Sequence, residues 1–430
     1  MDNKLLSKLN IYYMGAESFE DMEKLPALKP FDDGMVELLS ALSDEIRHDA
    51  SSKGNPVLQT YAFFIRRSNI LKQKEAFYTE GRIGKGLSLH IAPSNVPINF
   101  AYSLCSGLLS GNPCIVRASS KDFKETRIIC RLLKQLERSD RLSVSAKTAL
   151  KYIAVISYPH DKEITDALSA MVNVRVIWGG DRTVEEIRRS PVRPRCTEVC
   201  FADRYSILVV EAAGLISRLE EADDKDKLLS EIAHNFYNDT YLYDQNACGS
   251  PRLIYWLGTE DEINIAKDIF WNAVHEYVKD RYEIQPVIAV DKLTMADRTV
   301  IDIPGSGIIK GEDNLITRVE LSMSELNNLY SSDDSFSLYD YETPGGFYVE
   351  LSSESLEELV TFTDEKVQTC TFIDFKDKTS AETAKYLQNF VIEKGLKGID
   401  RIVPIGHSAD FGFIWDGYNL IDTFTRCVFV

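Results

Sequence analysis

The sequence predicts an α/β protein in which parallel-rich sheets are covered by helices. Short apolar strands alternate with amphipathic helices from about residue 87 to residue 211, and this alternation is typical of a doubly wound parallel sheet. A second alternation begins near residue 215, and a length of 430 residues predicts two or three domains. The composition, with 44% hydrophobic and 27% charged residues, excludes a disordered or fibrous chain.

The order of elements follows from apolar periodicity and from the residues that begin and end helices. Pro97 opens one helix, and Ser119 and Ser120 are natural caps for the next. The first half of the chain is expected to contain helices over residues 35–46 and 57–77, a strand over 87–92, a helix over 98–109, a strand over 114–117 and a helix from the two serines to about 136, followed by strands over 152–158, 174–178, 197–201 and 206–211 and helices over 163–171 and 183–189.

The second half of the chain is predicted to contain fewer regular elements. We expect a long helix before Cys248, strands over 252–257, 346–351 and 368–375, and helices over 260–282 and 355–362. Residues 291–340 are acidic and show no clear period, so they are predicted to be irregular, with residues 331–335 as an exposed loop.

The charge balance, the hydropathy and the cysteine pattern argue against nucleic-acid binding, a membrane span and a metal site. Lys and Arg number 49 and Asp and Glu number 66, so the net charge is −17 and the surface repels nucleic-acid phosphates. No apolar run is long enough to span a membrane, and the N-terminus lacks the apolar core of a signal peptide, so we expect a cytoplasmic protein. None of the eight cysteines forms a Cys-x-x-Cys pair, so we expect no metal site.

The first candidate for chemistry is Asn95, in the turn Pro93-Ser-Asn-Val-Pro97 between a strand and a helix. A side-chain amide held between two prolines can donate a hydrogen bond to an oxyanion that forms during catalysis. An Asn in this position also has a purely structural use as a turn or N-cap residue, and the motif alone favours that use.

The second candidate is Cys248, in the run Asp244-Gln-Asn-Ala-Cys-Gly-Ser-Pro-Arg252. Its small neighbours, Ala and Gly, leave room for a substrate to approach the sulfur. The alternative is a buried structural cysteine, which is the commoner use of a free cysteine. The pattern alone does not decide between the two.

Two turns after strands place small residues at helix starts, where free backbone amides bind phosphate. These turns are Arg117-Ala-Ser-Ser120 and Trp178-Gly-Gly-Asp181. Neither a G-x-G-x-x-G fingerprint nor a P-loop motif is present in the sequence. Because every α/β sheet has several such turns, these two are weak evidence on their own.

Longer runs of residues carry a family resemblance. The segment LHIAPSNVPINFAYSLCSGLLSGNPCIVRASSK (89–121) resembles the aldehyde dehydrogenase superfamily. The runs HIAPSNVPINFAYS, DQNACGSP, KVQTCTF and DRIVPIGHSADFGFIWDGYNLI resemble the acyl-CoA reductase family of bacterial bioluminescence and its non-luminous relatives, from about residue 60 to the C-terminus. This resemblance implies the NADPH-dependent reduction of a long-chain acyl-CoA or acyl-protein thioester to the aldehyde.

The resemblance also implies an aldehyde-dehydrogenase-like fold with two doubly wound α/β domains. Residues 1–220 would form N-terminal helices and a nucleotide-binding domain, and residues 221–399 a catalytic domain that carries the nucleophilic cysteine. Residues 400–430 would return to the first domain or to a partner subunit. A homo-oligomer and an acyl-protein synthetase partner are further implications.

Site residues follow by position in the family motifs. Cys248 matches the catalytic nucleophile and Asn95 matches the Asn that binds the oxyanion. The residues implied to contact NADPH are Arg117, Ser119, Ser120, Gly179, Gly180, Asp181 and Glu342. Asp181 stands where the superfamily has Ser, and a carboxylate repels phosphate.

Two departures from the superfamily pattern carry information. A Glu follows the basic residue in members that prefer NAD, whereas residues 118–121 here are Ala, Ser, Ser and Lys, which favours NADPH. The Glu that activates the deacylating water should fall near Cys200, and Glu198 is the nearest carboxylate in the sequence. The sequence therefore predicts an acyl-enzyme that is reduced and not hydrolysed.

Three alternatives to this reaction stay open on the sequence alone. One is a CoA-acylating aldehyde dehydrogenase that runs towards oxidation. Another is an acyltransferase that forms an acyl-cysteine without reducing it. The third is a non-catalytic scaffold subunit, although the presence of both Asn95 and Cys248 argues against it.

Overall fold

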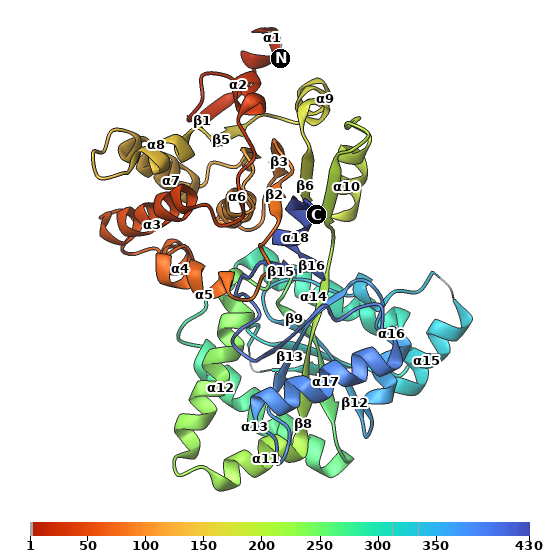
Figure 1. Cartoon of the computed structure of the whole chain (residues 1–430). Coiled ribbons are helices and arrows are strands. Elements are labelled where there is room, and N and C mark those ends of the chain that lie inside the picture. The colour runs from red at the N-terminus through yellow and green to blue at the C-terminus, as the bar shows by residue number, and fades with distance from the viewer. Residues whose placement is uncertain (1–2, 312, 334) are drawn as a thin grey trace. The chain divides into compact units, whose positions relative to one another are not determined.

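The computed structural model describes residues 3–311, 313–333 and 335–430. The chain divides into two compact units (Figure 1). Unit 1 contains the chain up to Asp203 together with Phe411–Val430, and unit 2 contains Arg204–Asp410. None of the described helices is long and apolar enough to cross a membrane.

Unit 1 is built on a six-stranded sheet in which β1 pairs antiparallel with β5 and the other pairs are parallel. The strand order is β1 (Asn10–Met14), β5 (Ile153–Ser157), β4 (Cys114–Arg117), β3 (Ser88–Ile91), β6 (Val174–Trp178) and β7 (Thr197–Phe201). All residues of β5 and β6 are buried, as expected for strands whose two faces are both covered.

Helices connect and cover the strands of unit 1. They are α1 (Asn3–Leu6), α2 (Phe19–Lys24), α3 (Asp33–His48), α4 (Pro56–Phe64), α5 (Arg67–Lys74), α6 (Asn99–Leu109), α7 (Lys124–Glu137), α8 (Val144–Leu150), α9 (Lys162–Met171), α10 (Asp181–Arg188) and α18 (Leu420–Phe424). The C-terminal strand β17 (Thr425–Cys427) pairs with β2 (Arg82–Gly84), and a short hairpin of β15 (Ile414–Trp415) and β16 (Tyr418–Asn419) precedes it.

Unit 2 is built on a seven-stranded sheet that is parallel except for the β10–β11 pair. The strand order is β10 (Gly307–Lys310), β11 (Thr317–Glu320), β12 (Phe347–Ser353), β9 (Pro251–Leu257), β8 (Tyr205–Glu211), β13 (Val367–Ile373) and β14 (Arg401–Pro404). Its helices are α11 (Ala212–Glu221), α12 (Lys225–Asp239), α13 (Glu260–Val278), α14 (Pro286–Asp302), α15 (Met323–Ser332), α16 (Leu359–Phe362) and α17 (Ser380–Lys394). The predicted α/β class with parallel-rich sheets is confirmed.

One predicted irregular region is wrong. Residues 291–340 hold most of α14, both strands of the antiparallel pair and α15, and residue 334 of the expected loop lies outside the described residues. Helix α14 shows no helical repeat of apolar residues, because it buries polar side chains, Lys292 and Thr299 among them, while Val287 and Leu293 are exposed. Apolar periodicity alone therefore fails for this helix.

Two helix boundaries in unit 1 also differ from the prediction. The expected helix over 57–77 is two helices, α4 and α5, with a break at Ile65–Arg66. The next correction concerns Ser119 and Ser120, which do not cap a helix, because α7 begins at Lys124 after Phe123. The Ser119 hydroxyl instead accepts a hydrogen bond from the Lys121 amide at 3.1 Å, which forms a short turn.

Candidate functional site

The sheet of unit 1 has a topological switch point beside β3. From this strand the chain order runs outward through β4 and β5 on one side and through β6 and β7 on the other. Ligands of open parallel sheets bind at such a point, outside the carboxyl ends of the strands. The register places Ile91, the last residue of β3, beside Arg117 of β4 and Ile177 of β6.

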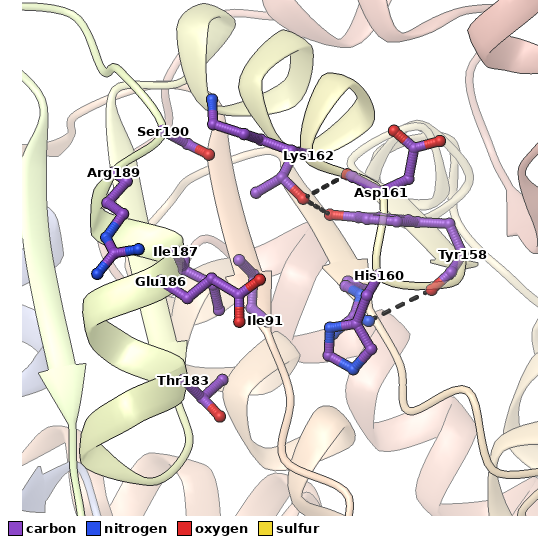
Figure 2. Close-up of a pocket in the computed structure, with 12 residues that line it drawn as sticks. Ile91, Tyr158, His160, Asp161, Lys162, Thr183, Glu186, Ile187, Arg189 and Ser190 are labelled. Carbon is purple, nitrogen blue, oxygen red and sulfur yellow. Dashed lines mark hydrogen bonds between the residues drawn. The ribbon is translucent and has the colours of Figure 1, made fainter.

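A cavity of about 270 Å³ opens at this carboxyl edge (Figure 2). Ile91 and Arg117 come from the strand ends, and the rest of the lining comes from the segment after β5 and from α10 and the residues that follow it. Its lining consists of Ile91, Arg117, Tyr158, His160, Asp161, Lys162, Thr165, Thr183, Glu186, Ile187, Arg189 and Ser190. Cationic, anionic and apolar side chains therefore share one cavity.

Arg117 is held against the wall of this cavity by Tyr158. Its guanidinium donates a hydrogen bond to the Tyr158 carbonyl at 3.3 Å and lies 4.8 Å from the centre of the Tyr158 ring. Burial raises the pKa of the Tyr158 hydroxyl, so this ring stays neutral beside the cation. The arginine is thus fixed in orientation at the place where the sequence predicted a cofactor contact.

The cavity also contains residues that the sequence analysis missed. Lys162 and Arg189 add two cations, and Asp161 and Glu186 add two carboxylates. Lys162 begins α9 and pairs with Asp166 at 2.6 Å, whereas Arg189 is the C-cap residue directly after α10. The sequence could have indicated these residues, because the segments that follow β5 and β6 both begin at the carboxyl edge of the sheet, where ligands bind.

The turn that opens α10 holds Gly179, Gly180 and Asp181. Two aspartates bind each other's backbone here, since the Asp181 amide donates to the Asp203 carboxylate at 3.1 Å and the Asp203 amide donates to Asp181 at 3.2 Å. A Cβ atom at Gly180 would lie 2.9 Å from the same Asp203 carboxylate. The first amide of the helix is therefore engaged by a carboxylate from the chain itself.

The other predicted residues of unit 1 lie at the same edge. Asn95 is exposed in the connection between β3 and α6, and α6 begins four residues later at Asn99. Ser119 is buried and Ser120 is exposed in the segment after β4.

In unit 2, Cys248 is exposed on a short loop between a single helical turn, Tyr241–Tyr243, and strand β9. Asp244 and Gln245 both adopt the left-handed backbone conformation, with φ of 51° and 60°. Such a conformation costs about 1–2 kcal/mol in each non-glycine residue, so other contacts must hold the loop.

Gln245 supplies those contacts. Its side chain is fully buried, and its amide nitrogen donates to the carbonyls of Pro251 and Phe347 at 2.9 and 3.0 Å. Its amide oxygen accepts from the backbone of Gly346 and Phe347 at 2.9 and 3.2 Å. One side chain therefore fastens the loop to both β9 and β12.

Further contacts fix the two sides of the cysteine. The Ser206 hydroxyl donates to the Cys248 carbonyl at 2.7 Å. Arg252 donates to the Gln245 carbonyl at 2.9 Å and pairs with Glu342 at 2.8 Å. Glu342, predicted as a cofactor contact, is thus linked through one arginine to the loop that carries Cys248.

The remaining cysteines of the chain contrast with Cys248. Burial raises the pKa of the Cys114, Cys130 and Cys370 thiols to about 12, and it raises the pKa of Cys105 as well. These thiols stay protonated at neutral pH and are poor nucleophiles. Among the described residues only Cys248 and Cys427 are exposed cysteines, and Cys248 is the one held on a fixed loop.

Glu198, the nearest carboxylate to the expected position of a deacylating base, is occupied. It lies in β7 and accepts from Arg175 at 2.7 Å and from Arg188 at 2.8 Å, through different carboxylate oxygens. Arg175 is itself 1% exposed. Both carboxylate oxygens of Glu198 therefore already accept hydrogen bonds from arginines of the chain itself.

A comparison with known families shows which family the chain belongs to. Residues 15–297, well over half of the chain, match the model of the family described as Acyl-CoA reductase (LuxC). The protein belongs to this family. The match contains Cys248, Asn95 and the cavity residues of unit 1.

Two relatives of the chain are named long-chain acyl-protein thioester reductase. The one from Aliivibrio fischeri is 28% identical over 179 residues, which cover 40% of this chain and 32% of the relative. The one from Vibrio harveyi is 24% identical over 341 residues, which cover 76% of this chain and 60% of the relative. The chain thus spans between about a third and three fifths of the length of these relatives.

Solved structures give the fold. Aldehyde dehydrogenase 21 from Physcomitrella patens, in complex with succinate, has a TM-score of 0.59 at 12% identity and covers 91% of this chain and 84% of its own. Glyceraldehyde-3-phosphate dehydrogenase GapN from Methanocaldococcus jannaschii, complexed with NADP, has a TM-score of 0.59 at 13% identity and covers 95% and 90%. The chain has the aldehyde dehydrogenase fold, as the sequence predicted.

Proposed function

We propose that the protein reduces a long-chain acyl thioester, presented as acyl-CoA or on an acyl-protein, to the aldehyde with NADPH and through an acyl-Cys248 intermediate. The observation that carries the proposal is the exposed Cys248 on a loop fastened by the buried Gln245 side chain, in a member of the acyl-CoA reductase family. The names of the two relatives support a thioester substrate.

The reaction begins when the Cys248 thiolate attacks the thioester carbonyl. The thiol of CoA or of the carrier protein leaves, and an acyl-cysteine remains. Backbone amides beside Cys248 stabilise the oxyanion, and Asn95 is assigned the role of side-chain donor by its place in the family motif. When bound, the nicotinamide supplies the hydride that reduces the acyl carbon. Cys248 then leaves as thiolate, and the aldehyde is released.

The cavity in unit 1 fits the anionic half of a dinucleotide. Two of its charged residues pair with groups outside the lining, Lys162 with Asp166 and Asp161 with Lys8. This leaves Arg117 and Arg189 against the carboxylate of Glu186, so a phosphate meets an excess of cations. Ile91 offers an apolar contact in the same cavity. We assign NADPH to this cavity, with Arg117 as the contact for the 2′-phosphate and Ser119, Ser120, Gly179, Gly180 and Asp181 as further cofactor residues. Glu342 of unit 2 is assigned to the cofactor by its place in the family motif alone.

The hydrogen bonds of the Glu198 carboxylate favour reduction of the acyl-enzyme over its hydrolysis. This carboxylate already accepts from Arg175 and Arg188, so it is not available to activate a water molecule. An acyl-protein synthetase that supplies the thioester and a homo-oligomeric assembly complete the proposal.

The test is the loss of NADPH absorbance in the presence of a long-chain acyl-CoA. The unaltered protein should consume NADPH and form aldehyde in equal amounts. Cys248→Ala should reduce this rate below detection. Cys427→Ala is the matched control, because Cys427 is the other exposed cysteine of the described chain, and it should keep the full rate. Undiminished turnover in Cys248→Ala would overturn the proposal.

A further inference from the structure

A second segment of unit 2 closes on the nucleophile loop. Strand β14 ends at Pro404, and the chain then turns back through residues 405–410, which we name the clamp loop. Arg401, in the same strand, donates from one guanidinium nitrogen to the Ser408 carbonyl at 2.5 Å. The other nitrogen donates to the carbonyls of His407 and Asp410 at 2.8 and 2.6 Å. One arginine therefore ties the clamp loop to its own strand.

Asp239, the last residue of α12, holds the clamp loop from the other side. Its carboxylate accepts from the backbone of Gly406 at 2.6 Å and of Ser408 at 2.8 Å. Asp239 and Ser408 are 2% and 1% exposed, so this contact is made in the interior. Gly406 has a φ of +93°, and a Cβ there would lie 2.7 Å from Asn235 of α12, which fits the tight approach.

The clamp loop in turn touches the residue next to the nucleophile. A Cβ atom on Gly249 would lie 2.6 Å from the Ser408 carbonyl oxygen. This is the same oxygen that accepts the hydrogen bond from Arg401. The backbone beside Cys248 is therefore separated from the guanidinium by a single carbonyl group.

The charge of Arg401 also reaches the sulfur. Burial lowers the pKa of the Arg401 guanidinium, and Asp410, Cys248 and Asp239 act against this effect through their charges. Asp239 faces Arg401 from α12 and Asp410 faces it from the clamp loop, where His407 pairs with Asp410 at 2.8 Å. Burial raises the pKa of Asp239 to about 6, so Asp239 is largely ionised above pH 7 and becomes protonated at the acid end of a pH titration of the thiol.

We propose that Arg401 is a positioning residue for Cys248, which presses the clamp loop against Gly249 through the Ser408 carbonyl and stabilises the Cys248 thiolate with its positive charge. The inference rests on the proposed role of Cys248 as the nucleophile. It assigns a use to the run that begins Asp400-Arg-Ile-Val-Pro404 in the sequence.

The test is the pH dependence of Cys248 alkylation by iodoacetamide in the full chain. Mass spectrometry of the peptides separates Cys248 from the other exposed thiol, Cys427. Rates measured from pH 6 to pH 10 give both the thiol pKa and the plateau rate of the fully ionised sulfur. The pKa reports the charge near the sulfur, whereas the plateau reports only its accessibility.

Arg401→Gln should raise the Cys248 pKa by about one unit and slow alkylation at pH 7 about tenfold, because an opposite charge nearby lowers a thiol pKa by ~1–3 units. Arg401→Lys keeps the charge and should recover at least half of this shift. Arg218→Gln is the matched control. Arg218 lies in α11, which follows the carboxyl end of β8, and it pairs with Asp374. In this variant the pKa of Cys248 should equal that in the unaltered protein.

Gly249→Ala provides a second variant that keeps every charge. The new methyl group would lie 2.6 Å from the Ser408 carbonyl oxygen, so the clamp loop and the Cys248 loop must move apart and the Cys248 pKa should again rise. An unchanged pKa in both Arg401→Gln and Gly249→Ala would overturn the inference, as would a change in the plateau rate alone. Because alkylation needs no substrate, the outcome stands apart from turnover: active Cys248→Ala enzyme would overturn the proposed function instead.

Discussion

The two units place their candidate residues at opposite ends of their sheets. In unit 1 the cavity lies at the carboxyl ends of β3 and β4, where the topology of a parallel sheet places a ligand. In unit 2, Cys248 precedes β9 and therefore lies at the amino end of that strand. Topology alone thus finds the first site, whereas the second is created by the side chains that fasten one loop.

The difference has a physical consequence. The cavity side chains in unit 1 come from strand ends, from the segment after β5 and from α10 and the residues after it, so a single substitution there should change binding and leave the fold intact. The Cys248 loop depends on Gln245, Arg252 and Ser206, so a substitution there should change the local structure itself. The predictions below separate these two kinds of effect.

Asn95→Ala should show the largest effect among them. The loss of one donor to the oxyanion costs ~10²–10³ in turnover, and acylation of Cys248 should remain detectable. Steady-state reduction of a long-chain acyl-CoA and mass spectrometry of the acyl-enzyme measure the two steps. Asn10→Ala, at the antiparallel edge strand β1, is the control and should keep its turnover. Full activity in Asn95→Ala would remove Asn95 from the account.

Gln245→Ala should loosen the Cys248 loop. The substitution leaves the amides of Gly346 and Phe347 without their acceptor in the interior, and each buried unsatisfied group costs ~1–3 kcal/mol. Hydrogen exchange of these two amides should accelerate by about 100-fold. Gln388→Ala removes an exposed glutamine of α17 in the same unit and should leave the exchange unchanged. Equal protection in both variants would show that Gln245 does not hold the loop.

Arg117→Ala should have a smaller and more selective effect. A charge-assisted hydrogen bond contributes ~1.5–3 kcal/mol, so the preference for NADPH over NADH should fall by about one to two decades while NADH binding changes little. Titration of both coenzymes by fluorescence measures this directly. Arg127→Ala, an exposed arginine of α7 that pairs with Asp122, is the control. Equal affinity of the unaltered protein for both coenzymes would contradict the assignment.

The fold was largely predictable because parallel strands buried on both faces leave continuous apolar runs, such as residues 153–157 and 174–178. Helix α14 was not, because Lys292 sits on its buried face and donates to the carbonyls of Asn314, Leu315 and Gly345, a pairing that no local pattern reveals.

The candidate site divides in the same way. Arg117 ends a strand and could be placed from sequence, and so could Cys248 through its family motif. Two sets of contacts could not be placed from sequence, because they join residues from different elements. Asp181 and Asp203 bind each other's backbone amides, and two arginines donate to Glu198. Such contacts depend on register and side-chain direction, which the sequence does not display.

The central claim is that Cys248 carries the acyl group as a thioester that water does not hydrolyse quickly. The direct measurement is to incubate the protein with a radiolabelled long-chain acyl-CoA without NADPH, remove the excess, and follow the label with and without added thiol. Without a positioned base, which typically contributes ~10²–10⁴ in rate, the label should stay on Cys248 for minutes or longer and leave quickly when thiol is added. Rapid release of free fatty acid without thiol, or a label that persists in Cys248→Ala, would contradict the account.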